Sequence, residues 1–198
     1  MQEMRVRLVY SKRGGACFVP HIALAQIFAR SAVRAGFRPE MTKGFSPRAR
    51  LSFAPELPAG VVALNEPADM YFYGDTFSLD AMNYALPQGF KISRVLFPAE
   101  DSPSLGKSCK FAEYLIRNTQ GLDFLDTAKY FYSHALVKAV YFDGWSRLIL
   151  HEPAQYPIGG LIKHLIAQNI ITGWHQVNIV RANIGLYDTQ KDCVCIYA

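Results

Sequence analysis

Apolar and polar residues alternate along the first part of the chain with a period that changes from strand to helix. Met4–Tyr10 alternates arginine with valine and leucine, which predicts a strand. His21–Phe37 repeats apolar residues every three to four positions, which predicts a helix with its end marked by Gly36. The remaining predicted elements are strands near Arg50–Phe53, at Asp69–Tyr73 and at Phe90–Phe97, and a short helix at Leu79–Leu86. Their order is β-α-β-β-α-β.

The second part of the chain repeats this order of elements. Asp143-Gly144 is the strongest short hairpin signal in the sequence, because type I′ turns favour this dipeptide. The predicted elements are strands at Lys110–Arg117, Leu136–Phe142 and Trp145–Leu150, and helices at Leu122–Tyr132 and Pro157–Ile170. Gly173–Tyr187 is predicted as one strand or as a pair of strands with a bend at Asn183–Gly185. The pattern therefore predicts a second β-α-β-β-α-β unit.

Two such units predict an α+β fold of two tandem ferredoxin-like modules. Residues 1–98 form the first module, which carries a basic loop, and residues 107–198 form the second. Each module is expected to hold an antiparallel sheet with helices on one face. The turn- and charge-rich segment Pro98–Lys107 joins them.

Composition adds a charge asymmetry to this picture. The 198 residues are 51% hydrophobic, enough for a substantial core, and carry a net charge of +5. Residues 1–50 hold ten Lys or Arg against two Glu, a net +8, whereas the rest of the chain is net negative. A concentrated basic sector predicts a polyanion or phosphate-bearing partner, and a solvated basic face is the alternative.

Other features bear on localisation and cofactors. No apolar run approaches the roughly 18–20 residues of a membrane span, and the N-terminus lacks a signal-peptide core, so a cytoplasmic protein without membrane contact is expected. Cys193 and Cys195 share one face of an extended segment, but no second pair of ligands accompanies them. The histidines lack metal-binding spacing and no nucleophile elbow occurs. We therefore predict no metal, no cofactor and no catalytic residues.

The candidate binding device is the loop around Gly44 and Pro47. Gly44 permits unusual backbone angles, and Pro47 orders the turn. Phe45 is expected either to anchor the loop in the core or to stack on a base. Basic groups of the loop and of the preceding helix then contact phosphate or carboxylate. The predicted anion- or nucleic-acid-binding residues are Lys12, His21, Arg30, Arg34, Lys43, Arg48 and Arg50.

The same residues carry a resemblance to a known family. Phe18, His21 and Leu24 match one segment, and Arg30, Arg34 and Gly36 fit the helix after it. The other matching stretches are Gly44–Ala49, Arg50–Ala54, Leu57–Gly60, Glu66, Asp69 and Met82–Gly89, with Arg181 as a later landmark. On these residues the chain resembles the radical-SAM-linked family, bacterial proteins largely without assigned function. Its members are encoded beside, or fused to, cobalamin-binding radical SAM proteins.

The resemblance implies a partner and also shows where this chain departs from the pattern. A radical SAM protein is the implied partner. Pro20 and Ala23 replace a Ser and an Asp of the family, and Arg48-Ala49 replaces His-Pro in the loop. These changes bear on whether the family's activity survives here.

Three functions fit the sequence. The leading hypothesis is a non-catalytic module that recognises RNA, or another phosphate-rich substrate, for the radical SAM partner. A second is a metal-independent RNA-processing endonuclease resembling CRISPR repeat-processing enzymes, with His21 and Lys12 or Lys43 as the acid–base pair. A third is a module that docks an acidic protein surface.

Overall fold

The computed structural model describes residues 3–197 as a mixed α+β fold built on one open sheet. Among these residues lie nine strands, mostly antiparallel, and five α-helices. The strands are β1 (Glu3–Lys12), β2 (Leu51–Phe53), β3 (Val62–Tyr73), β4 (Phe90–Leu96), β5 (Phe111–Asn118), β6 (Leu136–Phe142), β7 (Trp145–His151), β8 (Val177–Asp188) and β9 (Cys193–Cys195). The helices are α1 (His21–Arg34), α2 (Leu79–Ala85), α3 (Leu105–Ser108), α4 (Leu125–Phe131) and α5 (Ile158–Ala167).

The sheet is continuous across the two halves of the chain. Its strand order is β4-β1-β3-β8-β5-β7-β6, with β2 on β3 and β9 on β8. The two halves meet where β3 and β8 pair in parallel at Val62↔Val180 and Ala63↔Arg181. The predicted separate sheets are therefore joined. The short β2 pairs only with residues 68–70 of β3, which leaves the start of β3 for β8.

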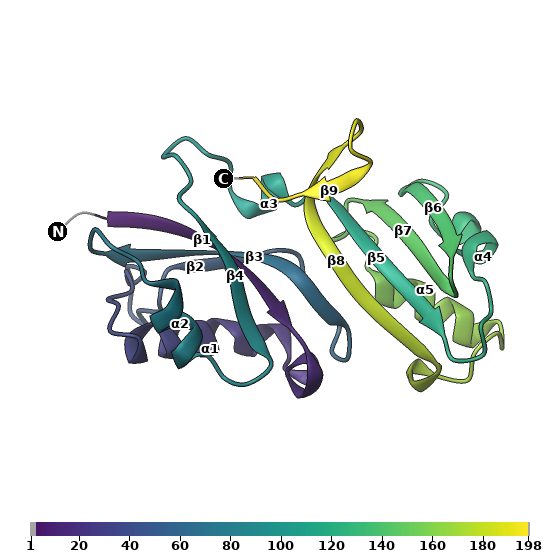
Figure 1. Cartoon of the computed structure of the whole chain (residues 1–198), viewed down its shortest axis with the longest axis horizontal. Helices are drawn as coiled ribbons and strands as arrows, with labels where there is room; N and C mark the ends of the chain where they lie inside the picture. The colour runs from purple at the N-terminus through teal and green to yellow at the C-terminus, as the bar shows by residue number, and fades with distance from the viewer. Residues whose placement is uncertain (1–2, 198) are drawn as a thin grey trace.

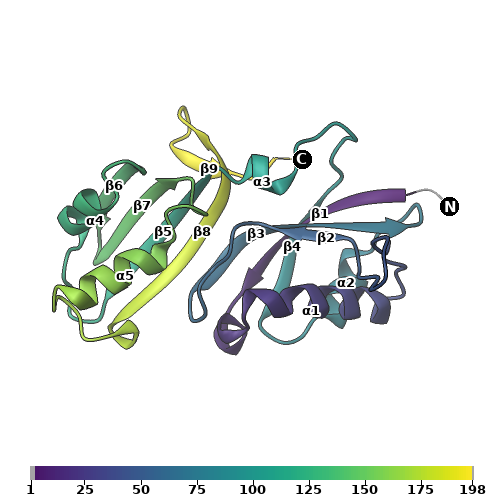
Figure 2. The same ribbon diagram turned by 180° about the vertical axis from the view of Figure 1, so that it is seen from behind.

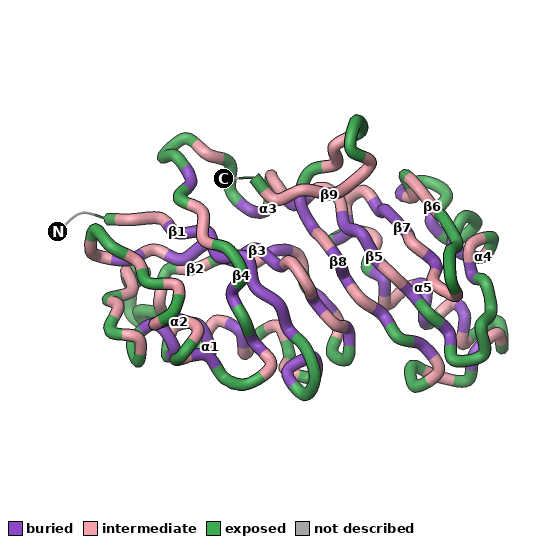
Figure 3. The backbone as a smooth tube through the Cα atoms, viewed as in Figure 1, coloured by how far each residue is buried: buried purple, intermediate pink, exposed green. Residues whose placement is uncertain are grey.

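Helices cover one face of each half (Figures 1 and 2). In the first half, Leu24 and Phe28 of α1 pack with Met82 of α2 against the strands. In the second half, Leu161 and Leu165 of α5 pack on β5 and β7. The buried residues follow the strands, whereas residues 41–48 are all exposed (Figure 3).

The second core also takes residues from the first half of the chain. Ala54, Leu57, Val61 and Ala63 are buried in the same cluster as the apolar residues of β5, β7 and α5. The segment between β2 and β3 therefore packs with the second half.

Local signals explain the ends of the elements. The end of α1 is a Schellman motif, in which Gly36 has φ +86° and the Phe37 N–H donates to the Ala32 carbonyl at 2.9 Å. Asp143 and Gly144 have positive φ angles and close the predicted hairpin between β6 and β7. Both predictions are confirmed. The strand predicted at Asp69–Tyr73 is longer than expected and begins at Val62.

No helix within residues 3–197 has both the length and the apolar character needed to cross a bilayer.

Candidate nucleic-acid interface

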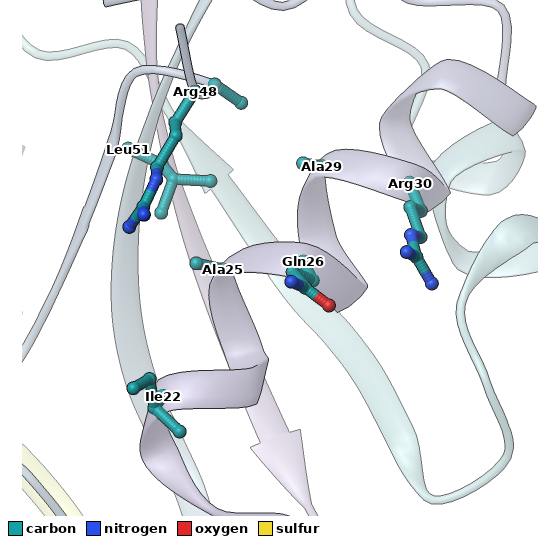
Figure 4. A pocket seen from close by; sticks show the side chains of 8 residues that line it. Ile22, Ala25, Gln26, Ala29, Arg30, Arg48 and Leu51 are labelled. Atoms are coloured by element: carbon teal, nitrogen blue, oxygen red, sulfur yellow. The ribbon is translucent and has the colours of Figure 1, made fainter. Parts of the chain in front are cut away.

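A groove runs between α1 and the loop that leads into β2 (Figure 4). We call it the basic groove. Its deeper part has a volume of about 480 Å³ and is lined by Ile22, Ala25, Gln26, Ala29, Arg30, Arg48, Ala49 and Leu51. A second hollow of about 420 Å³ continues it, lined by Ala29, Arg30, Val33, Arg34, Pro39, Met41 and Ala49. The two hollows share Ala29, Arg30 and Ala49, so they form one continuous surface.

The groove combines an apolar floor with a basic rim. Alanines of α1 and Leu51 of β2 form most of its floor, and the small alanine side chains leave the space open. Its charged lining residues are three arginines, Arg30, Arg34 and Arg48. In Figure 4, Arg30 projects from the helix side and Arg48 from the loop side, so the two guanidinium groups flank the floor. This surface suits a flat apolar group that carries negative charge.

The loop that forms one wall is closed at its base by hydrogen bonds. The Thr42 N–H donates to the Arg48 carbonyl at 2.7 Å, and the Arg48 N–H donates to Thr42 Oγ1 at 3.1 Å. Gly44 has φ +134°, a conformation that favours glycine, as its sequence position predicted. Lys43 and Phe45 lie in the tip and are exposed. Phe45 therefore does not anchor the loop in the core.

Arg50 lies outside the groove. Its guanidinium pairs with the Glu40 carboxylate at 2.9 and 3.0 Å and sits 3.8 Å from the centre of the Tyr71 ring. It lines a different hollow, together with Glu3 and Glu100. Ala49 and Leu51 face the groove, so the residue between them points to the other side of the extended chain.

Arg34 is held partly by the protein itself. Its guanidinium donates to Ser31 Oγ at 2.9 Å and to the Ala85 carbonyl at 2.7 Å, which ties α1 to the end of α2. Within residues 3–197, Arg30 and Arg48 form no ion pair with a carboxylate. The structure therefore brings three of the predicted residues, Arg30, Arg34 and Arg48, to one groove. Arg30 and Arg48 have no carboxylate of the described residues competing with a ligand for them.

Neither Lys12 nor His21 lines the groove. Lys12 is 2% exposed, and its ammonium donates to the Val19 carbonyl at 3.3 Å. Burial lowers the pKa of Lys12, although Cys17 and Glu66 oppose the shift. His21 is the first residue of α1, is half-buried and meets the Phe53 ring edge to face. Burial lowers the pKa of His21 and so favours the neutral ring, although the negative charge of Glu56 opposes this shift.

The structure contains buried charged residues that were not predicted as part of a site. Arg181 of β8 donates to the Glu66 carboxylate at 2.7 Å and to the Pro55 carbonyl at 2.9 Å, at the junction of the two halves. Burial alone would lower the pKa of Arg181, but Glu66 and Tyr114 together raise it. The signal for this pair in the sequence was that Glu66 and Arg181 both belong to the positions that carry the family resemblance.

A second buried network holds the segment between the halves. The Asp69 carboxylate accepts from Arg7 at 2.8 Å and from Arg5 at 2.7 Å. Arg5 also donates to the carbonyl of Ser102 at 2.8 Å, and Arg7 donates to that of Tyr197 at 2.6 Å. These two arginines of the +8 sector therefore act in the fold and are not available to a ligand.

The cysteines do not assemble a metal site. Cys193 and Cys195 lie on one face of β9, as predicted, with their sulfur atoms 3.3 Å apart. Cys17 and Cys109 are each buried elsewhere. Over residues 3–197, no three His, Cys, Asp or Glu side chains come together as metal ligands would.

Comparison with known proteins places the chain in a family. A family model described as "Uncharacterized protein conserved in bacteria (DUF2344)" matches residues 5–140. That match begins within β1, includes the whole basic groove and ends within β6. A comparison with curated proteins found no match.

Proposed function

The chain belongs to this family of uncharacterized proteins conserved in bacteria, and we propose that it is a non-catalytic module that binds RNA for a radical SAM partner enzyme. The basic groove carries this proposal. Arg30 and Arg48 face one apolar floor from two sides, and no internal ion pair competes for them within residues 3–197. Arginine suits this role because its planar fork of donors matches phosphate oxygens and its face stacks on bases.

The floor and the charge together favour a nucleotide chain over a simple anion. A small anion needs only charge and donors, whereas bases also need an apolar surface. Ala25, Ala29 and Leu51 supply such a surface beside the arginines. The two adjoining hollows, of about 480 and 420 Å³, favour a ligand of more than one nucleotide.

The radical SAM partner rests on the family resemblance of the first half of the chain. The Fe–S cluster of such chemistry requires a set of cysteine ligands. This sequence has only four cysteines and no such triad, so the cluster belongs to the partner in this proposal. Adjacent genes for this protein and a radical SAM protein, or their co-purification, would support it.

We further propose that each half is a ferredoxin-like module within the continuous sheet. The strand order supports this proposal. In the first half β2 lies beside β3 in the order β4-β1-β3, and the second half has the order β8-β5-β7-β6. When the four strands of each half are numbered 1 to 4 along the chain, both halves have the order 4-1-3-2. This is the order expected of a ferredoxin-like module.

RNA affinity measured at several salt concentrations tests the binding function. The logarithm of the association constant is expected to fall linearly with that of the salt concentration, with a slope of about −0.7 per phosphate neutralised on a single strand. Arg30→Ala and Arg48→Ala are each expected to weaken binding and to reduce the slope by about 0.7. The double change Arg48→Ala and Arg50→Ala is expected to weaken binding severalfold, chiefly through Arg48, because Arg50 is already paired with Glu40.

The matched control is Lys163→Ala, which removes one exposed charge from α5 in the second half. It is expected to leave the affinity close to that of the parent protein. Absence of salt-sensitive RNA binding at low salt would refute the proposal. Retention of an acidic protein in place of RNA would instead favour the protein-docking alternative.

A metal-independent endonuclease is the second candidate, favoured by the lowered pKa values of His21 and Lys12. The burial of Lys12 argues against it, because the ammonium lies out of reach of a substrate phosphate. Incubation of labelled structured RNAs with a chelator decides between the candidates. Cleavage that disappears in His21→Ala would establish the enzyme.

A further inference from the structure

Phe45 stands at the tip of the loop that borders the basic groove. It is fully exposed, although a phenylalanine ring is among the largest apolar side chains and is usually buried. Gly44 before it and Pro47 after it shape the loop. The ring takes no part in the core of the protein, so we expect a bound partner to cover it.

The loop presents this ring from a fixed base. Met41 bridges Ala49, and the two hydrogen bonds between Thr42 and Arg48 close the loop just below the tip. The Arg50 N–H donates to the Glu40 carbonyl at 2.6 Å one step further down. A ring held on a braced loop loses less freedom when it stacks on a ligand than one on a flexible tail.

Two basic residues lie close to Phe45 in the loop. Lys43 lies two positions before it and Arg48 three positions after it, and both are exposed. Three residues of extended chain span at most about 11 Å, so a short oligonucleotide that touches Phe45 also reaches Arg48 and the groove. An exposed aromatic ring next to cations is the combination by which proteins bind single-stranded nucleic acid.

Tyr130 is an exposed aromatic residue of the second half that lacks this setting. Tyr130 on α4 is 79% exposed, but the adjacent Lys129 is paired with Asp126 at 3.0 Å. Tyr130 therefore provides a matched comparison: a similar exposed ring on the second half, outside the basic sector.

We propose that Phe45 stacks on an unpaired base, and that the substrate class of the basic groove is single-stranded RNA. This inference rests on the proposed RNA-binding function and sharpens it. In an A-form duplex the bases are already stacked on one another and the deep major groove is too narrow for side chains. An unpaired base offers a free face to the ring while its neighbouring phosphates contact Lys43 and Arg48.

The experiment compares a short labelled oligouridylate with a blunt RNA duplex of equal length. The proteins are the parent, Phe45→Ala, Phe45→Trp and the control Tyr130→Ala. Loss of one base–aromatic stack is expected to weaken oligouridylate binding by Phe45→Ala roughly 5-fold to 150-fold. Phe45→Trp is expected to keep the affinity within about threefold, because the indole also stacks on bases.

Two further readouts separate stacking from a general loss of binding. The salt slope of Phe45→Ala is expected to equal that of the parent, because no charge has been removed. Its thermal unfolding is expected to be unchanged, since the ring contributes nothing to the core. Duplex binding, where present, is expected to be the same in all four proteins.

The outcomes distinguish this inference from the function on which it rests. If the parent protein binds neither RNA, the proposed function and the inference both fall. If Phe45→Ala binds oligouridylate as tightly as the parent, the inference falls while RNA binding by the groove stands. Equal loss of oligouridylate and duplex binding would overturn the single-strand preference.

Discussion

At the scale of single residues, this protein places several charges where water does not reach them. Arg181 and Glu66 are 1% and 3% exposed, respectively, and lie opposite each other between the two halves. Each is stabilised by its partner, so neither tolerates the loss of the other. A surface cation such as Arg48, in contrast, costs the fold little and remains available to a ligand.

Arg181→Met is therefore expected to lower the free energy of unfolding by about 3–5 kcal/mol, because it leaves the Glu66 carboxylate buried without a counter-charge. Urea unfolding followed by tryptophan fluorescence measures the change. Adding Glu66→Leu is expected to restore most of the loss, since an apolar pair of similar volume replaces the ion pair.

Lys129→Ala provides the control for this pair of variants. Lys129 is exposed and pairs with Asp126, so its loss is expected to cost less than about 1 kcal/mol. A small effect of Arg181→Met, similar to that of the control, would contradict the structural role of the buried pair.

At the scale of elements, a glycine in β8 allows the backbone of β9 to come close to it. A Cβ atom on Gly185 in β8 would lie 2.0 Å from the carbonyl oxygen of Cys195 in β9. Any side chain at this position therefore requires the backbone of β9 to move. The basic groove also depends on small residues, because the alanines of α1 leave room that larger side chains would fill.

Gly185→Ala is expected to displace β9 and to lower the free energy of unfolding by about 1–3 kcal/mol. Reaction of Cys193 and Cys195 with a thiol reagent measures the displacement, because both are half-buried against β8 and become more accessible when β9 moves. Gly106→Ala is the control, since a Cβ there meets nothing within 4 Å. Unchanged thiol reactivity in Gly185→Ala would show that β9 accommodates the methyl group.

At the scale of the whole molecule, the two halves share structure as well as a chain. Residues 54–63 contribute to the second core, and β3 pairs with β8. Arg5 and Arg7 bind the segment that connects the halves. Separation of the halves would therefore expose part of the second core and leave Arg181 without Glu66.

We expect both halves to unfold in one cooperative transition. Cys17 in the first half and Cys109 in the second are both buried, so each reports the unfolding of its own half. Pulse alkylation across a urea series, read by mass spectrometry, is expected to give one midpoint for the two thiols. Two separate midpoints would show that the halves are thermodynamically independent.

Most elements of the fold were predictable because their signals are local. The end of α1 at Gly36 and the turn at Asp143-Gly144 follow from backbone preferences of a few adjacent residues. The short α3 and β9 were not predicted, since neither has a periodic pattern long enough to recognise. The pairing of β3 with β8 joins residues more than 100 positions apart and leaves no periodic signal.

The candidate site was predictable in part. The basic sector and the loop at Gly44 were evident, but charge and glycine do not specify the direction of a side chain. Arg50 was indistinguishable from Arg48 in the sequence, yet only Arg48 faces the groove. Lys12 and His21 belong to the same basic sector, but Lys12 is buried, His21 is half-buried, and neither lines the groove.

The order of the longer elements, most of their ends and the concentration of positive charge in the first 50 residues follow from the amino-acid sequence alone. These properties depend on neighbours within a few positions or on composition alone. Which cations are exposed and which are buried, and the joining of the two halves in one sheet, are properties of the folded chain. The physical reason is that burial and pairing depend on distant partners, such as Arg181 and Glu66, which are 115 residues apart.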